Sequence, residues 1–405
     1  MKILIYGINY SPELTGIGKY TGEMARWLAE QGHDVRVITA PPYYPEWKVA
    51  EGYSGYWYKT TFEEGVRVTR CPLYVPAKQS TIKRLVHLSS FAISSGLALF
   101  GSLRWRPDRV IQLAPSLFCC PFTIAFSKLS GAKSLLHIQD FEIDALFGLG
   151  MASGNRIKSL AFSLESKTYN CFDRVSSISP SMVQRLVNKG AAADKTLLFP
   201  NWSETARFRE AKKSPTLLRE LGVRSDKKIL LYSGNIGEKQ GLEDLLDGAE
   251  KMLSSSDAIF LVVGDGASKK RLMESANIKN LKNIIFAPLQ PYDLLPTLLA
   301  SADVHLVIQK RGAADAVLPS KLTNILAVGG NTVITADADT SLGQLCHQHP
   351  NIAIRVEPES VEGLYAGIQQ ALKITSKNDT ASDYALKYLD KDYILNQFFS
   401  DLEAI

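Results

Sequence analysis

The residues best placed for chemistry in this 405-residue chain stand where predicted strands end. The most specific run is 310–321, in which Pro319 and Ser320 are typical of the start of a helix. Lys321 would then lie in the first turn, where a cation opposes the helix dipole unless an anion binds there. Arg311, Lys321 and the helix N-terminus could together hold a diphosphate. The alternative is a solvated basic loop.

Glycine-rich loops follow several predicted strands, an arrangement that lets backbone N–H groups approach an anion. The first loop contains Gly16 and Gly18 and could contact a phosphate or a sugar, or be a plain turn. A second set in the later half of the chain is the candidate donor site: Gly234, Asn235, Lys239, Gln240, Gly264 and Gly266. No dinucleotide GxGxxG, Walker A, GxSxG or HExxH sequence is present.

A third candidate lies at the end of the predicted strand 134–138. The two-residue period of a strand places His137 and Gln139 on one face, and Asp140 follows at the carboxyl end, where catalytic groups collect. Asp140 is therefore a candidate catalytic residue. His137 has two interpretations, a catalytic group or a hydrogen-bonded core histidine.

Short β-rich runs alternate with helical stretches, the pattern of parallel α/β sheets with right-handed crossovers. We expect two Rossmann-like domains, 1–200 and 216–380, and an aromatic-rich helical tail, 381–405, that packs back across them. Ligands bind outside the carboxyl ends of such strands, so the expected site is a central cleft that both domains face. The strands are expected at 2–6, 35–39, 66–70, 109–113, 134–138, 174–178, 196–199, 228–233, 258–263, 283–286, 304–308, 332–335 and 352–355.

Composition excludes several classes of protein. The chain carries 46 Lys+Arg and 41 Asp+Glu, and 45% of its residues are apolar, which excludes a disordered or low-complexity chain. Its five cysteines form no CxxC pair, so we expect reduced thiols, and no metal-ligand spacing is found. The N-terminus reads as a first strand and not as a signal peptide. No uncharged apolar run reaches the ~18–20 residues of a membrane span. The odd number of cysteines and the lack of a secretion signal lead us to expect a cytoplasmic protein.

Charge is unevenly placed, because 65–107 contains no acidic residue at all. Within this stretch, 88–103 is uncharged and apolar. It is either a core helix with solvated ends or part of a basic, apolar surface that lies on anionic lipid. Nucleic acid is disfavoured, because aromatic residues do not alternate with the basic ones. The basic residues are Arg67, Arg70, Lys78, Lys83, Arg84, Arg104 and Arg106.

The order of these motifs resembles that of the GT-B glycosyltransferases, specifically the retaining enzymes of family 4. The likeness covers nearly the whole chain. The landmarks, in order, are 15–18, Gln139-Asp140, 179–181, 199–202, 234–241, 263–266, and Pro319-Ser320-Lys321 leading to 327–329.

The resemblance is strongest to members that build the exopolysaccharide colanic acid. It implies a GDP-fucose donor in the second domain and a polyprenyl-diphosphate-linked saccharide acceptor in the first. It also implies a peripheral place on the inner face of the cytoplasmic membrane and no required metal. Arg311, Lys321 and Lys239 would stabilise the leaving diphosphate, with backbone N–H groups at Gly16 and Ser320. Asp140 or His137 would orient hydroxyl groups.

The chain also departs from the family pattern. Gln139-Asp140 stands where His-Asp is common, and Asn235 replaces an arginine of the donor loop. The Glu-x7-Glu signature is absent, and its positions fall at Ala316 and Asn324. Asn324 could still hydrogen-bond a ribose hydroxyl. These departures keep two alternatives open: a non-catalytic subunit that binds nucleotide sugar or lipid, and a nucleotide-sugar epimerase.

Overall fold

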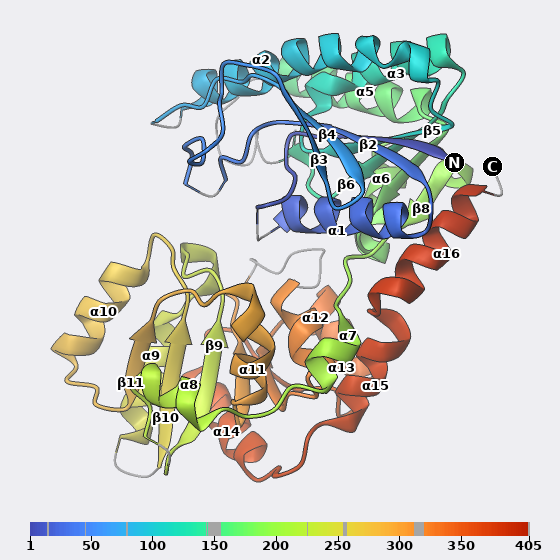
Figure 1. The fold of residues 1–405 in the computed structure, drawn as a ribbon. Coiled ribbons are helices and arrows are strands. Elements are labelled where there is room, and N and C mark those ends of the chain that lie inside the picture. Colours follow the sequence, from blue (N-terminus) through green and yellow to red (C-terminus); the bar gives the residue numbers. More distant parts are fainter. Residues whose placement is uncertain are drawn as a thin grey trace. The chain divides into compact units, whose positions relative to one another are not determined.

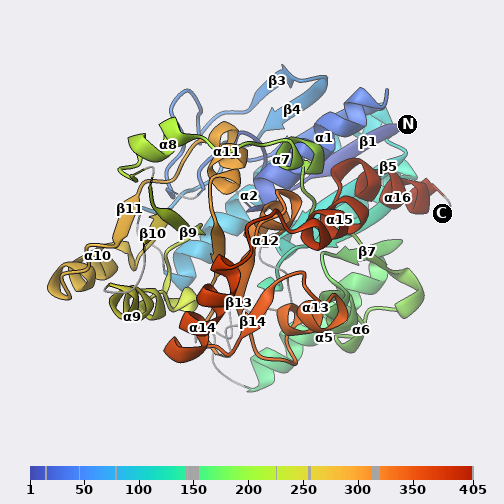
Figure 2. The same cartoon turned by 90° about the horizontal axis from the view of Figure 1, so that it is seen from below.

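The computed structural model describes residues 1–13, 16–44, 46–77, 80–142, 144, 155–224, 226–253, 257–311 and 320–403. The chain divides into two compact units, Met1–Pro200 and Asn201–Ile405. Each unit holds one sheet of its own with helices packed on it (Figures 1 and 2).

The first unit is built on an eight-stranded sheet in the order β3-β4-β2-β1-β5-β6-β7-β8. Every neighbouring pair is parallel except β3 with β4. The strand order reverses at β1, which lies between β2 and β5, and ligands of such sheets bind at this switch point. The strands are β1 Lys2–Tyr6, β2 Asp34–Thr39, β3 Lys59–Glu63, β4 Val66–Arg70, β5 Arg109–Ala114, β6 Lys133–Ile138, β7 Arg174–Ser177 and β8 Thr196–Leu198.

Helices cover both faces of this sheet. In Figure 1, α2, α3 and α5 lie on one side of it and α1 on the other. Tyr6 of β1 packs with Phe91 and Leu99 of α2 and Phe126 of α3 in one apolar core. The helices are α1 Gly16–Glu30, α2 Thr81–Gly101, α3 Cys120–Ser130, α5 Asn155–Cys171 and α6 Pro180–Asn188.

The second unit is built on a six-stranded, wholly parallel sheet in the order β11-β10-β9-β12-β13-β14. Alternate residues of β9 enter two different cores, Ile229 and Leu231 on one face and Leu230 and Tyr232 on the other. The order reverses at β9, so the switch point lies at the end of that strand. The strands are β9 Lys228–Ser233, β10 Ala258–Val263, β11 Ile284–Ala287, β12 Val304–Val307, β13 Thr332–Thr335 and β14 Ile354–Val356.

The helices of the second unit divide between those two cores. Residues of α9, α10 and α14 belong to the core that contains Tyr232, and residues of α8, α11, α12, α13 and α15 belong to the other. In the expected tail, α15 packs against α12 and α7 of the same unit. The helices are α7 Thr205–Arg209, α8 Pro215–Glu220, α9 Glu243–Met252, α10 Lys269–Ile278, α11 Leu295–Ala300, α12 Ser320–Ala327, α13 Ser341–Gln348, α14 Val361–Leu372, α15 Asp379–Tyr388 and α16 Lys391–Glu403.

All the expected strands are present within two residues at either end, but sequence reasoning missed β3. The expectation that the strands are all parallel is therefore wrong at this edge, because β3 runs antiparallel to β4. The physical reason is local. β3 has the sequence KTTFE, which lacks an apolar run, and it pairs only with β4. Strand β3 is held by backbone hydrogen bonds to its one neighbour β4, and backbone hydrogen bonds produce no hydropathy pattern in the sequence.

The long helix α2 also differs from expectation. The segment Ile82–Trp105 spans 24 residues, and its most apolar 18-residue window has a mean hydropathy of 1.4, so by length and composition it could cross a membrane. The expectation that no apolar run is long enough for a membrane span is therefore wrong for this segment. Of its most apolar window, 39% is buried within the protein. One face of α2 therefore belongs to a core, and another face is open.

Two neighbouring positions of α2 test this division. Phe91 is 0% exposed and Ile93 is 63% exposed. Phe91→Ala should lower the free energy of unfolding by about 3–5 kcal/mol, because it leaves a cavity in the core. Ile93→Ala should change it by about 0.5 kcal/mol or less. Urea unfolding followed by circular dichroism measures both, and equal losses would contradict the assignment of faces.

Candidate active site

The end of β6 places its three candidate residues in different environments. Asp140 is exposed two residues beyond Ile138, the last residue of β6, whereas Gln139 is buried. His137 is also buried, and its Nδ1 lies 2.9 Å from Ser176 Oγ on the neighbouring strand β7. Its ring packs 4.9 Å from that of Phe199. Burial lowers the pKa of His137 to about 3, so the ring is neutral. The structure thus gives His137 the core role and leaves Asp140 as the group that a substrate can reach.

The loop after β1 contains a buried carboxylate that sequence reasoning missed. Glu13 Oε2 accepts a hydrogen bond from Asn9 Nδ2 at 2.9 Å, and Oε1 accepts from the backbone N–H groups of Tyr43 and Tyr44. Burial raises the pKa of Glu13. A side chain at Gly18 would place its Cβ 2.7 Å from Glu13 Cβ. The packing of Glu13 therefore explains this glycine, independently of any ligand.

Gly16 lies in a different setting from Gly18. It is the first residue of α1 and its φ is +61°. Apart from its chain neighbours and its own helix, no atom of the described residues lies within 4 Å of the position of a Cβ. A left-handed backbone at a helix start favours glycine. The open space leaves Gly16 compatible with the predicted anion contact.

Glu142, two residues after Asp140, is a second buried carboxylate at this edge. Its Oε2 accepts hydrogen bonds from the backbone N–H groups of Ser116 and Leu117, at 3.1 and 3.0 Å. Burial raises the pKa of Glu142. These amides lie 25 and 26 residues earlier, in the loop after β5, so the pairing cannot be read from the local sequence.

In the second unit, Lys321 lies at the carboxyl end of β9. It is the second residue of α12, and its Nζ is 4.1 Å from the centroid of the Tyr232 ring. Burial lowers the pKa of Lys321 to about 7. Within the described ranges no carboxylate lies within ion-pair distance of this ammonium group. A partly desolvated cation that rests on an aromatic face is well placed to gain from a bound anion.

Gly234 lies beside the Lys321 side chain. A Cβ at Gly234 would lie 3.5 Å from Lys321 Cδ and 3.8 Å from Nζ, and the φ of Gly234 is +148°. Tyr232 is fixed in turn, because its hydroxyl donates to the Asn235 carbonyl oxygen at 2.5 Å. Lys321, Tyr232, Gly234 and Asn235 are thus brought together, although 86 residues separate Asn235 from Lys321 in the sequence. We call these four residues the Lys321 cluster.

The glycines after β10 have a structural reason of their own. A Cβ at Gly264 would lie 1.9 Å from the Gly234 carbonyl oxygen, and a Cβ at Gly266 would lie 2.5 Å from that of Ile236. The two loops are also bonded, because Ile236 N–H donates to the Asp265 carbonyl at 2.8 Å. The space above these glycines is therefore filled by the neighbouring loop, which explains both glycines without a bound donor, and the predicted donor contact stays a prediction.

The remaining donor-loop candidates are described only in part. Gln240 Oε1 accepts from the Gly237 N–H at 3.1 Å and so closes its own loop. Lys239 lies in the same short turn, Glu238–Gln240, and its side chain is outside the described structure. Ser320 begins α12, also without a described side chain, and Pro319 is outside the described residues.

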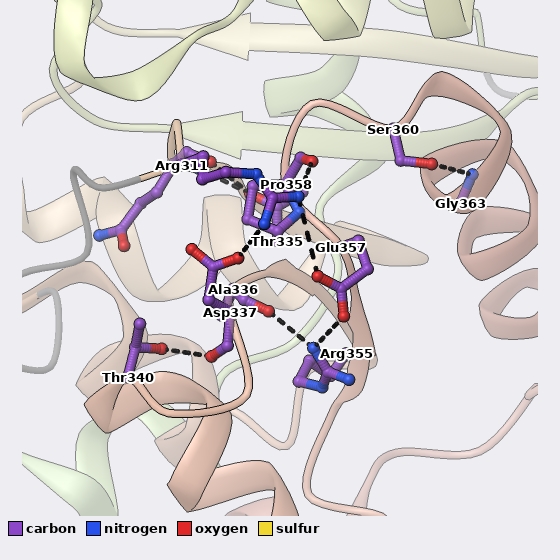
Figure 3. A network of polar contacts seen from close by, with 11 residues as sticks. Arg311, Thr335, Ala336, Asp337, Thr340, Arg355, Glu357, Pro358, Ser360 and Gly363 are labelled. Atoms are coloured by element: carbon purple, nitrogen blue, oxygen red, sulfur yellow. Dashed lines mark hydrogen bonds and ion pairs between the residues drawn. The ribbon is translucent and has the colours of Figure 1, made fainter.

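Arg311 is committed to protein partners. Its Nη1 lies 2.6 Å from Asp337 Oδ1, and its Nη2 lies 3.3 Å from the Pro358 carbonyl oxygen and 3.9 Å from Glu357 Oε2 (Figure 3). Arg355 joins the same network through Glu357 and the Ala336 carbonyl. Arg311 therefore ties together the loops after β12, β13 and β14. A diphosphate would have to compete with these partners for it.

Asn324 is buried, which changes its predicted role. Its Oδ1 accepts a hydrogen bond from Ser203 Oγ at 2.8 Å. The Oδ1 atom is thus used within the protein, so the ribose contact expected from the sequence would have to come from Nδ2, and it stays a prediction. Asn324 instead fixes the start of the second unit to α12.

Two protein families match this chain, one in each of the two units. Residues 15–202 match the family described as glycosyl transferase 4-like domain, and residues 213–388 match glycosyl transferases group 1. The Escherichia coli K12 protein named as a colanic acid biosynthesis glycosyl transferase, WcaI, is 56% identical over 410 residues, which cover 100% of both chains. The chain belongs to the family 4 glycosyltransferases.

Solved structures agree with a GT-B glycosyltransferase fold. Sucrose-phosphate synthase of Thermosynechococcus elongatus has a TM-score of 0.73 at 14% identity and covers 100% of this chain and 99% of its own. The HepE protein of Anabaena, solved in complex with UDP, has a TM-score of 0.70 at 14% identity and covers 100% of both chains. At this identity the likeness concerns the fold alone.

Within the described ranges, no group of three or more His, Cys, Asp or Glu residues could hold a metal ion. Among the described candidates, the Lys321 cluster in the second unit and Asp140 in the first are the charged groups that stay predicted substrate contacts.

The neutral state of His137 predicts a pH dependence of stability. Its folded pKa of about 3 is lower than the unfolded value of about 6.5, so unfolding takes up a proton between these values. Stability from this residue is therefore present above about pH 6.5 and lost as the pH falls. His137→Gln should make the loss of unfolding free energy shallower by up to about 1.4 kcal/mol per pH unit.

Urea titrations between about pH 6 and 4 measure this slope. The exposed His347 provides the matched control, and His347→Gln should leave the slope as in the unmodified protein. An unchanged slope in His137→Gln would show that His137 is charged in the folded protein.

Proposed function

We propose that this protein transfers fucose from GDP-fucose, with retention of configuration, to a saccharide carried on polyprenyl diphosphate. The product would belong to exopolysaccharide (colanic acid) biosynthesis. The enzyme would work in the cytoplasm, peripherally bound to the inner face of the membrane, where an anionic lipid surface presents the acceptor. No metal is required in this proposal.

The observation that carries the proposal is the Lys321 cluster. An ammonium group rests on the Tyr232 ring beside Gly234, at the switch point of the second sheet, with no carboxylate partner among the described residues. A diphosphate would supply the missing counter-charge. It would also meet the N-terminus of α12, where backbone N–H groups favour an anion.

The proposed chemistry follows from that charge. The bond between the anomeric carbon and the diphosphate breaks, and negative charge develops on the leaving group. The acceptor oxygen bonds to the anomeric carbon on the same face and passes its proton to the departing phosphate. Lys321 stabilises the developing charge, a preorganised interaction of the kind worth roughly 3–4 kcal/mol. Asp140, exposed at the end of β6, orients a sugar hydroxyl.

The names of two similar proteins support the proposed classes of donor and acceptor. The WcaI protein is named for colanic acid biosynthesis, and HepE was solved with UDP-glucose as well as with UDP. Carried over to this chain, they favour a nucleoside-diphosphate sugar as donor and an exopolysaccharide precursor as acceptor. The guanine base and the fucose are the finer parts of the proposal and need a direct test.

A thermal-shift panel of GDP-, UDP-, ADP- and dTDP-sugars tests the donor. Saturating GDP-fucose, at ~100 times its Kd, should add about 2.7 kcal/mol of stability, which raises Tm measurably. A shift with another nucleotide alone would keep the reaction class and reject GDP-fucose. Release of free sugar nucleotide isomers without any acceptor would instead favour an epimerase.

Lys321 should make donor binding depend on pH. Because a bound diphosphate favours the charged ammonium, affinity should fall as the pH rises above about 7, by up to about tenfold per pH unit. Calorimetric titration of GDP measures this, and Lys321→Met should weaken binding and flatten the dependence. Lys228, exposed at the opposite end of β9, gives the control Lys228→Met, which should bind GDP normally. A Lys321→Met variant with unchanged GDP affinity would reject this site.

Asp140 should affect turnover more than donor binding. Asp140→Asn keeps the shape of the side chain but removes its charge, so kcat should fall by about 100-fold or more while the Kd for GDP stays the same. Transfer assays with a lipid-linked acceptor measure kcat. Activity close to that of the unmodified enzyme would reject Asp140 as a catalytic residue.

A further inference from the structure

We propose that α2 and an adjoining aromatic segment form one surface that lies flat in the interface of an anionic lipid bilayer. This proposal deepens the proposed function, because the surface is where the enzyme would meet a lipid-linked acceptor. It rests on the proposed function for the existence of that acceptor. We call it the interfacial surface. Its members are Ile82, Val86, Ile93 and Leu97 of α2 together with Tyr56, Trp57, Tyr58 and Tyr74.

The apolar side chains of α2 that face outward fall on one stripe. All four are exposed, and their spacing of 4, 7 and 4 residues places them within an arc of about 60° on a helix of 3.6 residues per turn. The buried residues Leu88, Phe91 and Leu99 lie on the opposite side, against the sheet. A core helix of a water-exposed protein normally carries polar residues on its outer face. Here the outer face is apolar as well, and Figure 1 shows α2 along the outside of the first unit.

The aromatic residues are held beside this stripe by hydrogen bonds to α2. Tyr58 Oη donates to the Ser94 carbonyl oxygen at 2.9 Å, and the Tyr74 N–H donates to Ser90 Oγ at 2.9 Å. Ser90 and Ser94 lie about 20–60° around the helix from the edge of the stripe. The aromatic segment therefore borders the stripe along the middle of α2. Tyr56 and Trp57 next to it are 85% and 74% exposed.

The residue types select a bilayer as the occupant. Tryptophan and tyrosine concentrate at membrane interfaces, where the ring enters the acyl boundary and the polar atom meets the headgroups. The stripe also ends in positive charge on both sides, with Lys83 and Arg84 in the first turn of α2 and Arg104 and Arg106 beyond its end. No acidic residue lies anywhere between 65 and 107. Each such charge favours an anionic lipid surface.

The packing of α2 favours a helix in the interface plane over one that crosses the membrane. His87 Nδ1 lies 2.5 Å from the Tyr74 carbonyl oxygen, and Ser94 Oγ donates to the Pro72 carbonyl at 2.5 Å. Crossing would break these bonds and remove Phe91 from its core. A helix that keeps one face on the protein and offers the other to lipid satisfies both.

Vesicle sedimentation with the full chain tests the proposal. The protein should pellet with vesicles that contain phosphatidylglycerol and much less with pure phosphatidylcholine. Ile93→Ser with Leu97→Ser, and separately Tyr56→Ser with Trp57→Ser, should each lower the partition coefficient about tenfold or more. Neutralising Lys83, Arg84, Arg104 and Arg106 to Gln should lower it by about fivefold per charge. Carbonate at high pH should release the protein, because nothing spans the bilayer.

Tryptophan fluorescence tests whether Trp57 enters the interface. The other four tryptophans, Trp27, Trp47, Trp105 and Trp202, are buried or half-buried, so a blue shift on vesicle addition reports Trp57. Trp57→Phe should remove the shift while most of the binding remains. The control is Ile278→Ser, which alters an apolar residue on α10 of the second unit that is more exposed than Ile93 and Leu97, and it should leave partition unchanged.

Several outcomes would overturn the surface. They are equal pelleting of the apolar variants and the unmodified protein, equal binding to neutral vesicles, and retention after carbonate. A concentration-dependent dimer that the same variants disrupt would assign this face to a second copy of the chain. Transfer to a water-soluble acceptor with a short lipid separates the two proposals, because the variants should keep that activity. Loss of membrane binding with intact transfer leaves the proposed function standing, and absent transfer with intact binding contradicts only that function.

Discussion

Burial of both faces of two largely parallel sheets is the constraint on which the rest of this structure depends. Parallel strands covered by helices on each side can carry few polar side chains along their length. Charged and hydroxyl groups are therefore displaced to the strand ends. Asp140 follows β6, Arg311 lies beyond the end of β12, and Lys321 reaches the end of β9 from α12. The candidate residues therefore lie at strand ends because the two cores have no room for polar side chains.

The same constraint explains why some expected ligands became structural. A cation or amide near a strand end finds partners in the adjacent loops before any substrate arrives. Arg311 is held by Asp337 and Pro358, and Asn324 is held by Ser203. Lys321 differs, because its surroundings are an aromatic ring and a glycine. Binding energy for an anion is greatest where the protein has not already supplied the counter-charge, and of Arg311 and Lys321 it is Lys321 that meets this condition.

Helix α2 departs from the usual pattern of a helix with one apolar face on the core and a polar face toward water. Its inner face belongs to the core of the first unit, and its outer face exposes an apolar stripe bordered by tyrosine and tryptophan. In water such a face costs free energy, so a protein that retains it is expected to have something to place against it. If the acceptor is anchored in lipid, as we propose, contact with the bilayer would explain why the protein keeps this apolar face.

The sequence by itself determined the strands, the alternation into two α/β units and the candidate status of Asp140 and Lys321. These follow from local patterns: apolar runs of strand length, glycine-rich loops and a lysine at a helix start. Tertiary structure decided the partners. It buried His137 and Asn324, tied Arg311 to Asp337, and added β3 at the sheet edge. Hydrogen bonds and close packing join residues far apart in the chain, so a single sequence read along its length does not contain them.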